Sequence, residues 1–129
     1  MKQKIIVDTS IWIKYFRKRN DIVKFIEERI MDNCIFMTGP IVSELLQGVK
    51  TESEYNKLNN CIDGIPYLKT YMADWKKAGN LSFNLRRKGI TIPLTDIVIS
   101  AVAINNNAKV YTLDKHFNNI PDVTIYKLY

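Results

Sequence analysis

Two residue types that often carry covalent stability or chemistry are scarce in this sequence. It contains two cysteines, Cys34 and Cys61, and a single histidine, His116. The cysteines do not have the paired spacing of a zinc or redox motif, and a secreted domain held by disulfides usually contains more of them. We therefore expect two reduced thiols that pack as small apolar groups. With one histidine, no credible Ser-His-Asp or Cys-His catalytic set is visible.

Long hydrophobic runs, internal repeats and low-complexity stretches are also absent from the sequence. The apolar run Ile5–Val7 is followed at once by an aspartate, and it is too short for a signal-peptide core or a membrane span. We therefore expect a cytoplasmic protein with no membrane partner. The 129 residues, of which 47% are hydrophobic and 25% charged, fit one globular domain spanning residues 1–129.

Positive charge is in excess. Lysine and arginine number 19 against 13 aspartates and glutamates, which gives a formal net charge of +6. A basic surface favours anionic partners such as nucleic acid, anionic lipid or an acidic protein segment, although it can also serve solubility alone.

Short apolar runs alternate with longer helical patterns along the chain. We expect strands at Ile5–Val7, 34–37, 65–68, 109–112 and 123–126, with Pro66 confining the third to a sheet edge. The intervening segments predict helices near 11–13, from a cap at Asp21 to residue 30, and over 38–49, 51–61, 71–88 and 95–104. Strands separated by helices indicate an α/β fold with a short central parallel sheet of four to five strands and helices on both faces.

Four acidic residues are predicted to reach one rim of that sheet. Asp8 directly follows the first strand, and Asp114 follows the strand at 109–112. Asp96 opens an apolar helix, and Glu44 lies one turn inside the helix that begins near Pro40, off the centre of its apolar face. In parallel sheets, ligands bind beyond the carboxyl ends of the strands, which makes this rim the expected site.

Each acid also has an ordinary structural explanation. Asp8, Asp96 and Asp114 stand at helix starts, where aspartate is favoured by capping and by the helix dipole, and a lone glutamate such as Glu44 is usually solvated. Taken together, however, converging carboxylates repel one another, and a hard cation would relieve that repulsion. Mg²⁺ and Mn²⁺ prefer oxygen ligands and can activate water against a phosphodiester.

Five segments stand out by their order and spacing, and they are residues 6–10, 40–45, 85–89, 94–101 and 112–117. Together they resemble the PIN-domain family and specifically its VapC-type toxins of bacterial toxin–antitoxin pairs, and the resemblance covers the whole chain. It implies a Mg²⁺- or Mn²⁺-dependent endoribonuclease whose acidic quartet matches Asp8, Glu44, Asp96 and Asp114, with Ser10 and Thr112 in supporting positions. It further implies a homodimer, a cognate antitoxin that covers the site, and a larger assembly of toxin and antitoxin.

Several cations are possible RNA contacts, because they could bind phosphates. They are Arg17, at the end of the first helix, the cluster Arg86, Arg87 and Lys88 at the end of a later helix, and His116, close to Asp114. Completion of a helix C-terminus explains the cluster equally well, and a surface or packing role explains His116.

Other functions remain open on sequence alone. An aspartate-nucleophile phosphatase usually shows Asp-x-Asp after its first strand, whereas this chain has Asp8-Thr9-Ser10. A signalling receiver would place a phosphorylatable aspartate after a middle strand, where residues 37–40 read Met-Thr-Gly-Pro. A non-catalytic RNA- or protein-binding module and a metal-dependent nuclease acting on DNA are the remaining alternatives.

Overall fold

A five-stranded, all-parallel sheet forms the centre of the molecule in a computed structural model that describes residues 3–127. The strand order is β3-β2-β1-β4-β5, so the first strand is central and the chain winds outward from it in both directions. The strands are β1 (Ile5–Val7), β2 (Ile35–Thr38), β3 (Tyr67–Leu68), β4 (Lys109–Tyr111) and β5 (Thr124–Ile125). This confirms the predicted α/β class and a sheet of four to five strands.

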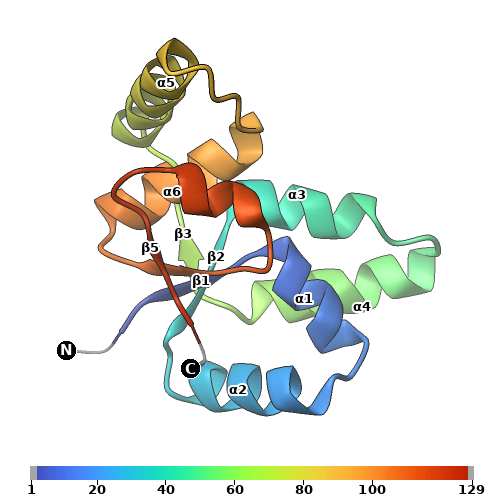
Figure 1. The fold of residues 1–129 in the computed structure, drawn as a ribbon. Coiled ribbons are helices and arrows are strands. Elements are labelled where there is room, and N and C mark those ends of the chain that lie inside the picture. Colours follow the sequence, from blue (N-terminus) through green and yellow to red (C-terminus); the bar gives the residue numbers. More distant parts are fainter. Residues whose placement is uncertain (1–2, 128–129) are drawn as a thin grey trace.

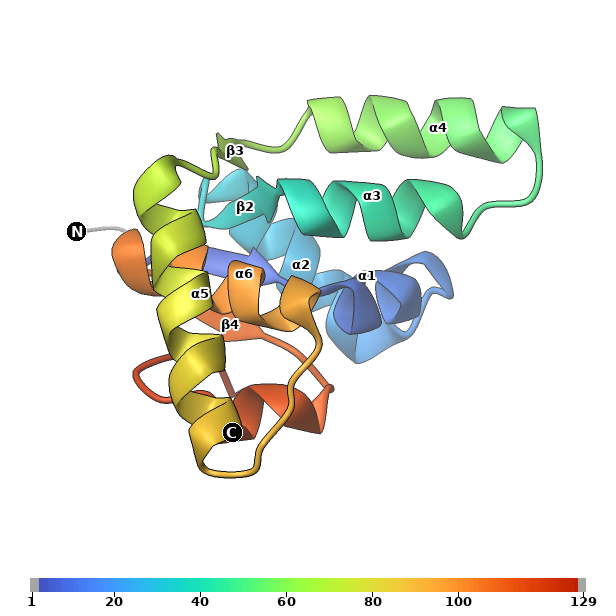
Figure 2. The ribbon, with the colours of Figure 1, turned by 90° about the horizontal axis from the view of Figure 1, so that it is seen from above.

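Six α-helices and one 3-10 helix accompany the sheet within residues 3–127. They are α1 (Thr9–Phe16), α2 (Asn20–Met31), α3 (Gly39–Gln47), α4 (Glu52–Asp63), α5 (Met72–Arg87), α6 (Leu94–Asn105) and the 3-10 helix η1 (Lys115–Asn119). Figure 1 shows α6 on one side of the sheet, with α5 packed outside it, and α2 on the other side. Viewed from above, α3 and α4 lie side by side and extend away from the strands (Figure 2).

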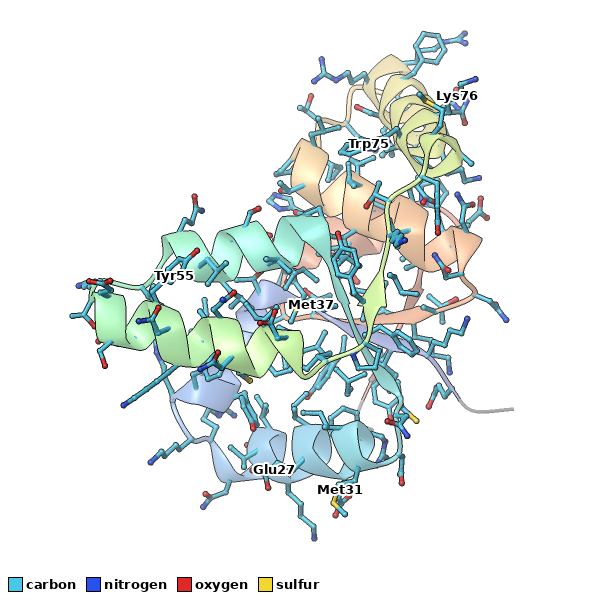
Figure 3. The ribbon with its side chains drawn as sticks, turned by 180° about the vertical axis from the view of Figure 1, so that it is seen from behind. Glu27, Met31, Met37, Tyr55, Trp75 and Lys76 are labelled. Atoms are coloured by element: carbon cyan, nitrogen blue, oxygen red, sulfur yellow. The ribbon has the colours of Figure 1, made fainter. Side chains whose placement is uncertain are left out.

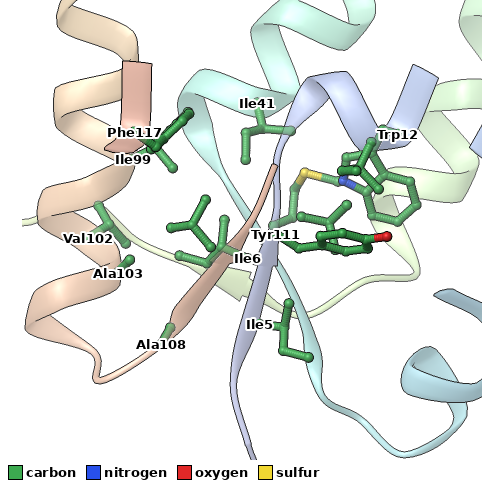
Figure 4. Close-up of a cluster of buried hydrophobic side chains, with 14 of the residues drawn as sticks. Ile5, Ile6, Trp12, Ile41, Ile99, Val102, Ala103, Ala108, Tyr111 and Phe117 are labelled. Carbon is green, nitrogen blue, oxygen red and sulfur yellow. The ribbon is translucent and has the colours of Figure 1, made fainter. Parts of the chain in front are cut away.

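The central strand is apolar throughout because both of its faces are covered. Ile5, Ile6 and Val7 are all fully buried, and successive side chains of a strand point to opposite faces. Figure 4 shows Ile6 directed toward α6, close to Val102 and Ala103, while Ile5 points to the opposite side. Apolar side chains therefore pack against both faces of the sheet, and this packing fixes the position of β1 and of the residue that follows it.

Some predicted boundaries differ from the structure by one or a few residues. The second helix begins at Asn20 with Arg19 at its N-cap, so the prediction that Asp21 caps it is wrong. Asp21 instead forms an exposed ion pair with Arg19, at 3.6 Å. The predicted stop at Gly89 is confirmed, because Gly89 follows α5 with a positive φ of 79°, a conformation that glycine adopts without a steric penalty.

The edge position of the third strand is also as predicted. Pro66 precedes β3, which pairs with β2 and lies at one end of the sheet formed by the described strands. Residues 1, 2, 128 and 129, which the predicted domain bounds of 1–129 include, lie outside the described residues. No helix in the described range is long and apolar enough to cross a membrane.

Candidate metal centre

Asp8 stands where the central strand passes into the first helix. Its backbone N–H donates to the carbonyl of Tyr111 at 2.9 Å, which continues the pairing of β1 with β4 by one residue. Asp8 occupies the N-cap position of α1, but its side chain makes no capping hydrogen bond there. The residue is only 5% exposed. Capping therefore does not explain this aspartate.

Two hydroxyl groups hold the Asp8 carboxylate in place. Ser10 Oγ and Thr112 Oγ1 both donate to Asp8 Oδ2, at 2.9 and 2.8 Å, and the two hydroxyl oxygens are 3.4 Å apart. Thr112 Oγ1 also accepts the backbone N–H of Asp114 at 2.9 Å, and Ser10 Oγ accepts that of Leu113 at 3.0 Å. The hydroxyls thus tie the end of β1 to the segment after β4 and fix Asp8 relative to Asp114.

Thr112→Val tests this connection, because valine keeps the shape of threonine without its hydroxyl. We expect the free energy of unfolding to fall by about 1–3 kcal/mol, since the change leaves a buried carboxylate short of one donor and the Asp114 N–H without its acceptor. Urea denaturation in chelator measures this difference. The exposed Thr91 provides the matched control, and Thr91→Val is expected to stay within about 0.5 kcal/mol of the wild type. Equal stabilities of the two variants would contradict the proposed tie.

Asp114 and Asp96 face the same histidine ring. His116 Nδ1 lies 3.0 Å from Asp114 Oδ1 and 3.4 Å from Asp96 Oδ2. The backbone N–H of His116 also donates to Asp114 Oδ1 at 2.9 Å, so Asp114 does cap the 3-10 helix η1, as its ordinary explanation predicts. The ring therefore bridges a carboxylate on the loop after β4 and one on α6.

Asp96 lies in the first turn of α6 but does not cap it. Pro93 is at the N-cap position and no side chain makes a cap hydrogen bond, so the capping explanation of Asp96 is wrong. The residue is 6% exposed, and its helix is buried along most of its length. A carboxylate in this position needs a compensating positive charge, because burial disfavours its ionised form.

Glu44 completes the acidic group from α3. Thr9 Oγ1 donates to Glu44 Oε1 at 3.3 Å, which links the first residue of α1 to the fourth acid. The prediction of site residues did not include Thr9. Its place directly between Asp8 and Ser10 was the only sequence signal, and a contact 35 positions along the chain cannot be read from that place.

The electrostatics indicate that these acids lie close enough to repel one another. The pKa of Asp96 is raised from its ordinary 3.8 to about 6, first by burial and then by the charges of Asp114 and Asp8, with His116 acting in the opposite direction. The pKa of Glu44 is also raised, by burial and by the charge of Asp8, while the hydrogen bond from Thr9 lowers it. The structure therefore brings Asp8, Glu44, Asp96 and Asp114 together at the rim where the strands end.

The donor set of this rim suits a divalent cation. Ligand atoms of Asp96, Asp114 and His116 all lie within 4.8 Å of one another. Carboxylate oxygens are the preferred ligands of Mg²⁺ and Mn²⁺. A cation would offset the burial of the Asp96 carboxylate and neutralise the repulsion from Asp114 and Asp8, which together raise its pKa. The residues present thus fit a divalent metal ion chemically and electrostatically.

The predicted cations lie in different places. Arg17 lines a groove that also contains Thr9 and Glu44, so it stands next to the acidic group. Arg86 and Arg87 are in the last turn of α5, followed by Lys88 at its C-cap, which agrees with their helix-terminal explanation. The guanidinium of Arg87 lies 5.5 Å from the centroid of the Phe83 ring.

Cys34 and Cys61 are free thiols, as predicted.

The sequence and the fold of this chain are both similar to those of known proteins. Residues 5–123 match the family model described as PIN domain. The chain is 30% identical over 125 residues to the VapC ribonuclease Mb1587 of Mycobacterium bovis, covering 93% of each chain, and 28% identical to Ribonuclease VapC of Rickettsia bellii, covering 94% of this chain and 93% of that one. Among solved structures, the fold is similar to VapBC2 from Rickettsia felis bound to a promoter DNA fragment, with a TM-score of 0.85, 21% identity and coverage of 96% and 98%.

Proposed function

Since this chain belongs to the PIN domain family, we propose that it is a Mg²⁺- or Mn²⁺-dependent endoribonuclease and the toxin of a toxin–antitoxin pair. The observation that carries the proposal is the convergence of Asp8, Glu44, Asp96 and Asp114, whose mutual repulsion contributes to the raised pKa values of Asp96 and Glu44. Relatives named ribonucleases that match nearly the full length of the chain support the same activity.

The four carboxylates would hold the cation, and Ser10 and Thr112 would position Asp8. Because both hydroxyls donate to Asp8 Oδ2, Oδ1 is the oxygen left to face a cation. When bound, a divalent ion supplies charge neutralisation at the phosphate and activation of the attacking water. Arg17 shares a groove with Glu44, and we propose that it contacts a phosphate next to the cleaved bond. For Arg86, Arg87 and Lys88 an RNA contact remains a proposal that rests on charge alone.

An antitoxin segment has a suitable surface beside this site. A groove beside α1, α3 and α4 is lined by the charged residues Arg17, Glu44 and Glu54 and by several apolar side chains. The apolar side chains are Ile13, Phe16, Leu45, Val49 and Leu58. Ile13 and Phe16 are 40% and 42% exposed, which is high for large apolar side chains. We propose that the cognate antitoxin occupies this groove and thereby blocks access to the acids.

A homodimer is the further assembly we propose for the toxin. Exposed aromatic side chains gather around the start of α3, where Tyr67 and Trp75 line a hollow together with Pro40 and Ser43. Figure 3 shows Trp75 near the start of α5. Aromatic residues are enriched at protein interfaces, so this surface is the proposed contact between two copies. We also propose a cytoplasmic location, which is consistent with an RNA substrate.

Cleavage of total RNA by the purified, antitoxin-free protein is the direct test. We expect cuts in the presence of Mg²⁺ or Mn²⁺, none in chelator, and a loss of about a hundredfold or more for Asp8→Asn, because that change removes one ligand charge while keeping side-chain shape. Single-stranded and duplex DNA serve as competing substrates in the same assay. Metal-dependent cuts in DNA alone would favour the DNA nuclease, and no cleavage together with no metal binding would favour a binding module.

A further inference from the structure

His116 occupies a position that the acidic quartet does not explain. Its ring nitrogen Nδ1 faces two carboxylate oxygens from different elements, Asp114 Oδ1 at 3.0 Å and Asp96 Oδ2 at 3.4 Å. The side chain is half exposed, so burial does not force it into this arrangement. A ring nitrogen between two carboxylates can either donate a proton to them or bind a cation together with them.

The spacing of these atoms suits a shared cation. Octahedral ligand bonds of about 2.1 Å place adjacent ligand atoms about 3.0 Å apart and opposite ones about 4.2 Å apart. The two nitrogen–oxygen distances lie close to the adjacent spacing, and the three ligand atoms are all within 4.8 Å of one another. The three groups are therefore close enough to one another to share one cation.

We infer that His116 is a metal ligand through Nδ1, and that Asp96, Asp114 and His116 form a mixed nitrogen–oxygen site within the acidic centre. The inference rests on the proposed function, because it assigns a further ligand to the same metal centre. An imidazole ligand favours first-row transition metals, whereas carboxylate and water ligands alone suit Mg²⁺. The site therefore prefers Mn²⁺ to Mg²⁺ by more than its carboxylates alone would provide.

The sequence makes this inference directly testable, because His116 is the only histidine. In untagged wild-type protein loaded with Mn²⁺, pulsed electron paramagnetic resonance is expected to show the nitrogen modulation of a coordinated imidazole. His116→Gln removes a group at the Nδ1 position and is expected to lose that modulation. Calorimetry should show the Kd for Mn²⁺ rising by roughly tenfold or more in this variant, with a smaller change for Mg²⁺.

Matched variants separate ligation from other effects. Asn119→Gln alters an exposed residue of the same 3-10 helix and should keep both the nitrogen modulation and the Mn²⁺ affinity. His116→Asn restores an amide oxygen near the Nδ1 position and should bind Mg²⁺ as the wild type does, without the imidazole signal. The wild-type spectrum decides the question even if a variant fails to fold, because no other imidazole exists in the chain.

The outcomes also distinguish this inference from the proposed function. Mn²⁺ binding that is lost in Asp96→Asn but shows no nitrogen modulation in the wild type would overturn the role of His116 and leave the carboxylate centre intact. Undetectable Mn²⁺ and Mg²⁺ binding by the wild type would overturn both. Nitrogen modulation in the wild type together with weaker Mn²⁺ binding in His116→Gln would establish the mixed site.

Discussion

Asp96→Asn is expected to melt at a higher temperature than the wild type in chelator, although it should cleave RNA at least a hundredfold more slowly in Mg²⁺. In the absence of metal the Asp96 carboxylate is nearly buried and faces like charges, and its pKa is raised to about 6. At neutral pH the wild type must ionise this group at a cost that asparagine avoids. We expect a gain of about 1–3 kcal/mol, which corresponds to a rise of several degrees in Tm.

The pH dependence of that gain has a definite sign. Between the ordinary pKa of 3.8 and the folded value of about 6, the folded wild type binds more protons than the unfolded chain. The stability of the wild type therefore falls as pH rises through this window, and the advantage of Asp96→Asn is complete above it and vanishes below it. Thermal denaturation in chelator at a series of pH values measures the effect.

Asp122→Asn is the matched control for this substitution. Asp122 is exposed and has a positive φ of 69°, a conformation that asparagine also adopts readily. Its substitution should leave Tm nearly unchanged at every pH. A lower Tm for Asp96→Asn in chelator would mean that the contact between Asp96 and His116 outweighs the repulsion, and that Asp96 serves the fold rather than a cation.

In millimolar Mg²⁺ or Mn²⁺ the wild type is expected to be more stable than Asp96→Asn, the reverse of their order in chelator. A ligand that binds only the folded state stabilises it by about 2.7 kcal/mol at one hundred times its Kd. The wild type should gain that amount, whereas Asp96→Asn, which lacks one ligand charge, should gain much less. The two stabilities therefore cross as the metal concentration rises, and differential scanning fluorimetry can follow both curves.

Ionic strength needs a separate control, because salt also screens the repulsion among the acids. Sodium chloride at matched ionic strength should raise the wild-type Tm by only a small part of the divalent effect. An equal response to sodium and to the divalent ions would show that screening, rather than coordination, explains the stabilisation. The divalent effect should also weaken below pH 6, where protons compete with the metal for Asp96.

Much of this arrangement could be predicted from sequence because it follows from chain order. Asp8 immediately follows β1 and Asp114 lies three residues after the end of β4, and neighbouring parallel strands necessarily end on the same side of the sheet. The buried strand Ile5–Val7 and the end of α5 at Gly89 depend on local residue properties, so they could also be predicted. Glu44 and Asp96 could be placed at the same rim because each lies near the start of a helix, and the motifs that resemble the PIN-domain family supported the complete set of four.

The parts that escaped prediction depend on side-chain directions in three dimensions. Aspartate at a helix start favours capping on average, but Asp8 and Asp96 make no cap hydrogen bonds in the folded chain. The bond from Thr9 to Glu44 depends on how α1 and α3 pack. The position of the His116 ring between Asp96 and Asp114 depends on η1. This short 3-10 helix has no periodic sequence pattern from which it could be predicted.

The two outermost strands have a consequence for how copies of this protein can associate. β3 and β5 contain two residues each, and they are the edge strands of the sheet as far as residues 3–127 define it. Such short edges offer few unpaired backbone groups, so another chain has little template on which to add a strand and start an aggregate. Association must therefore use side chains on the helices and loops. The strand order thus protects the sheet against amyloid-like growth. The same order places the longer strands, and the acids that follow them, at the centre of the sheet.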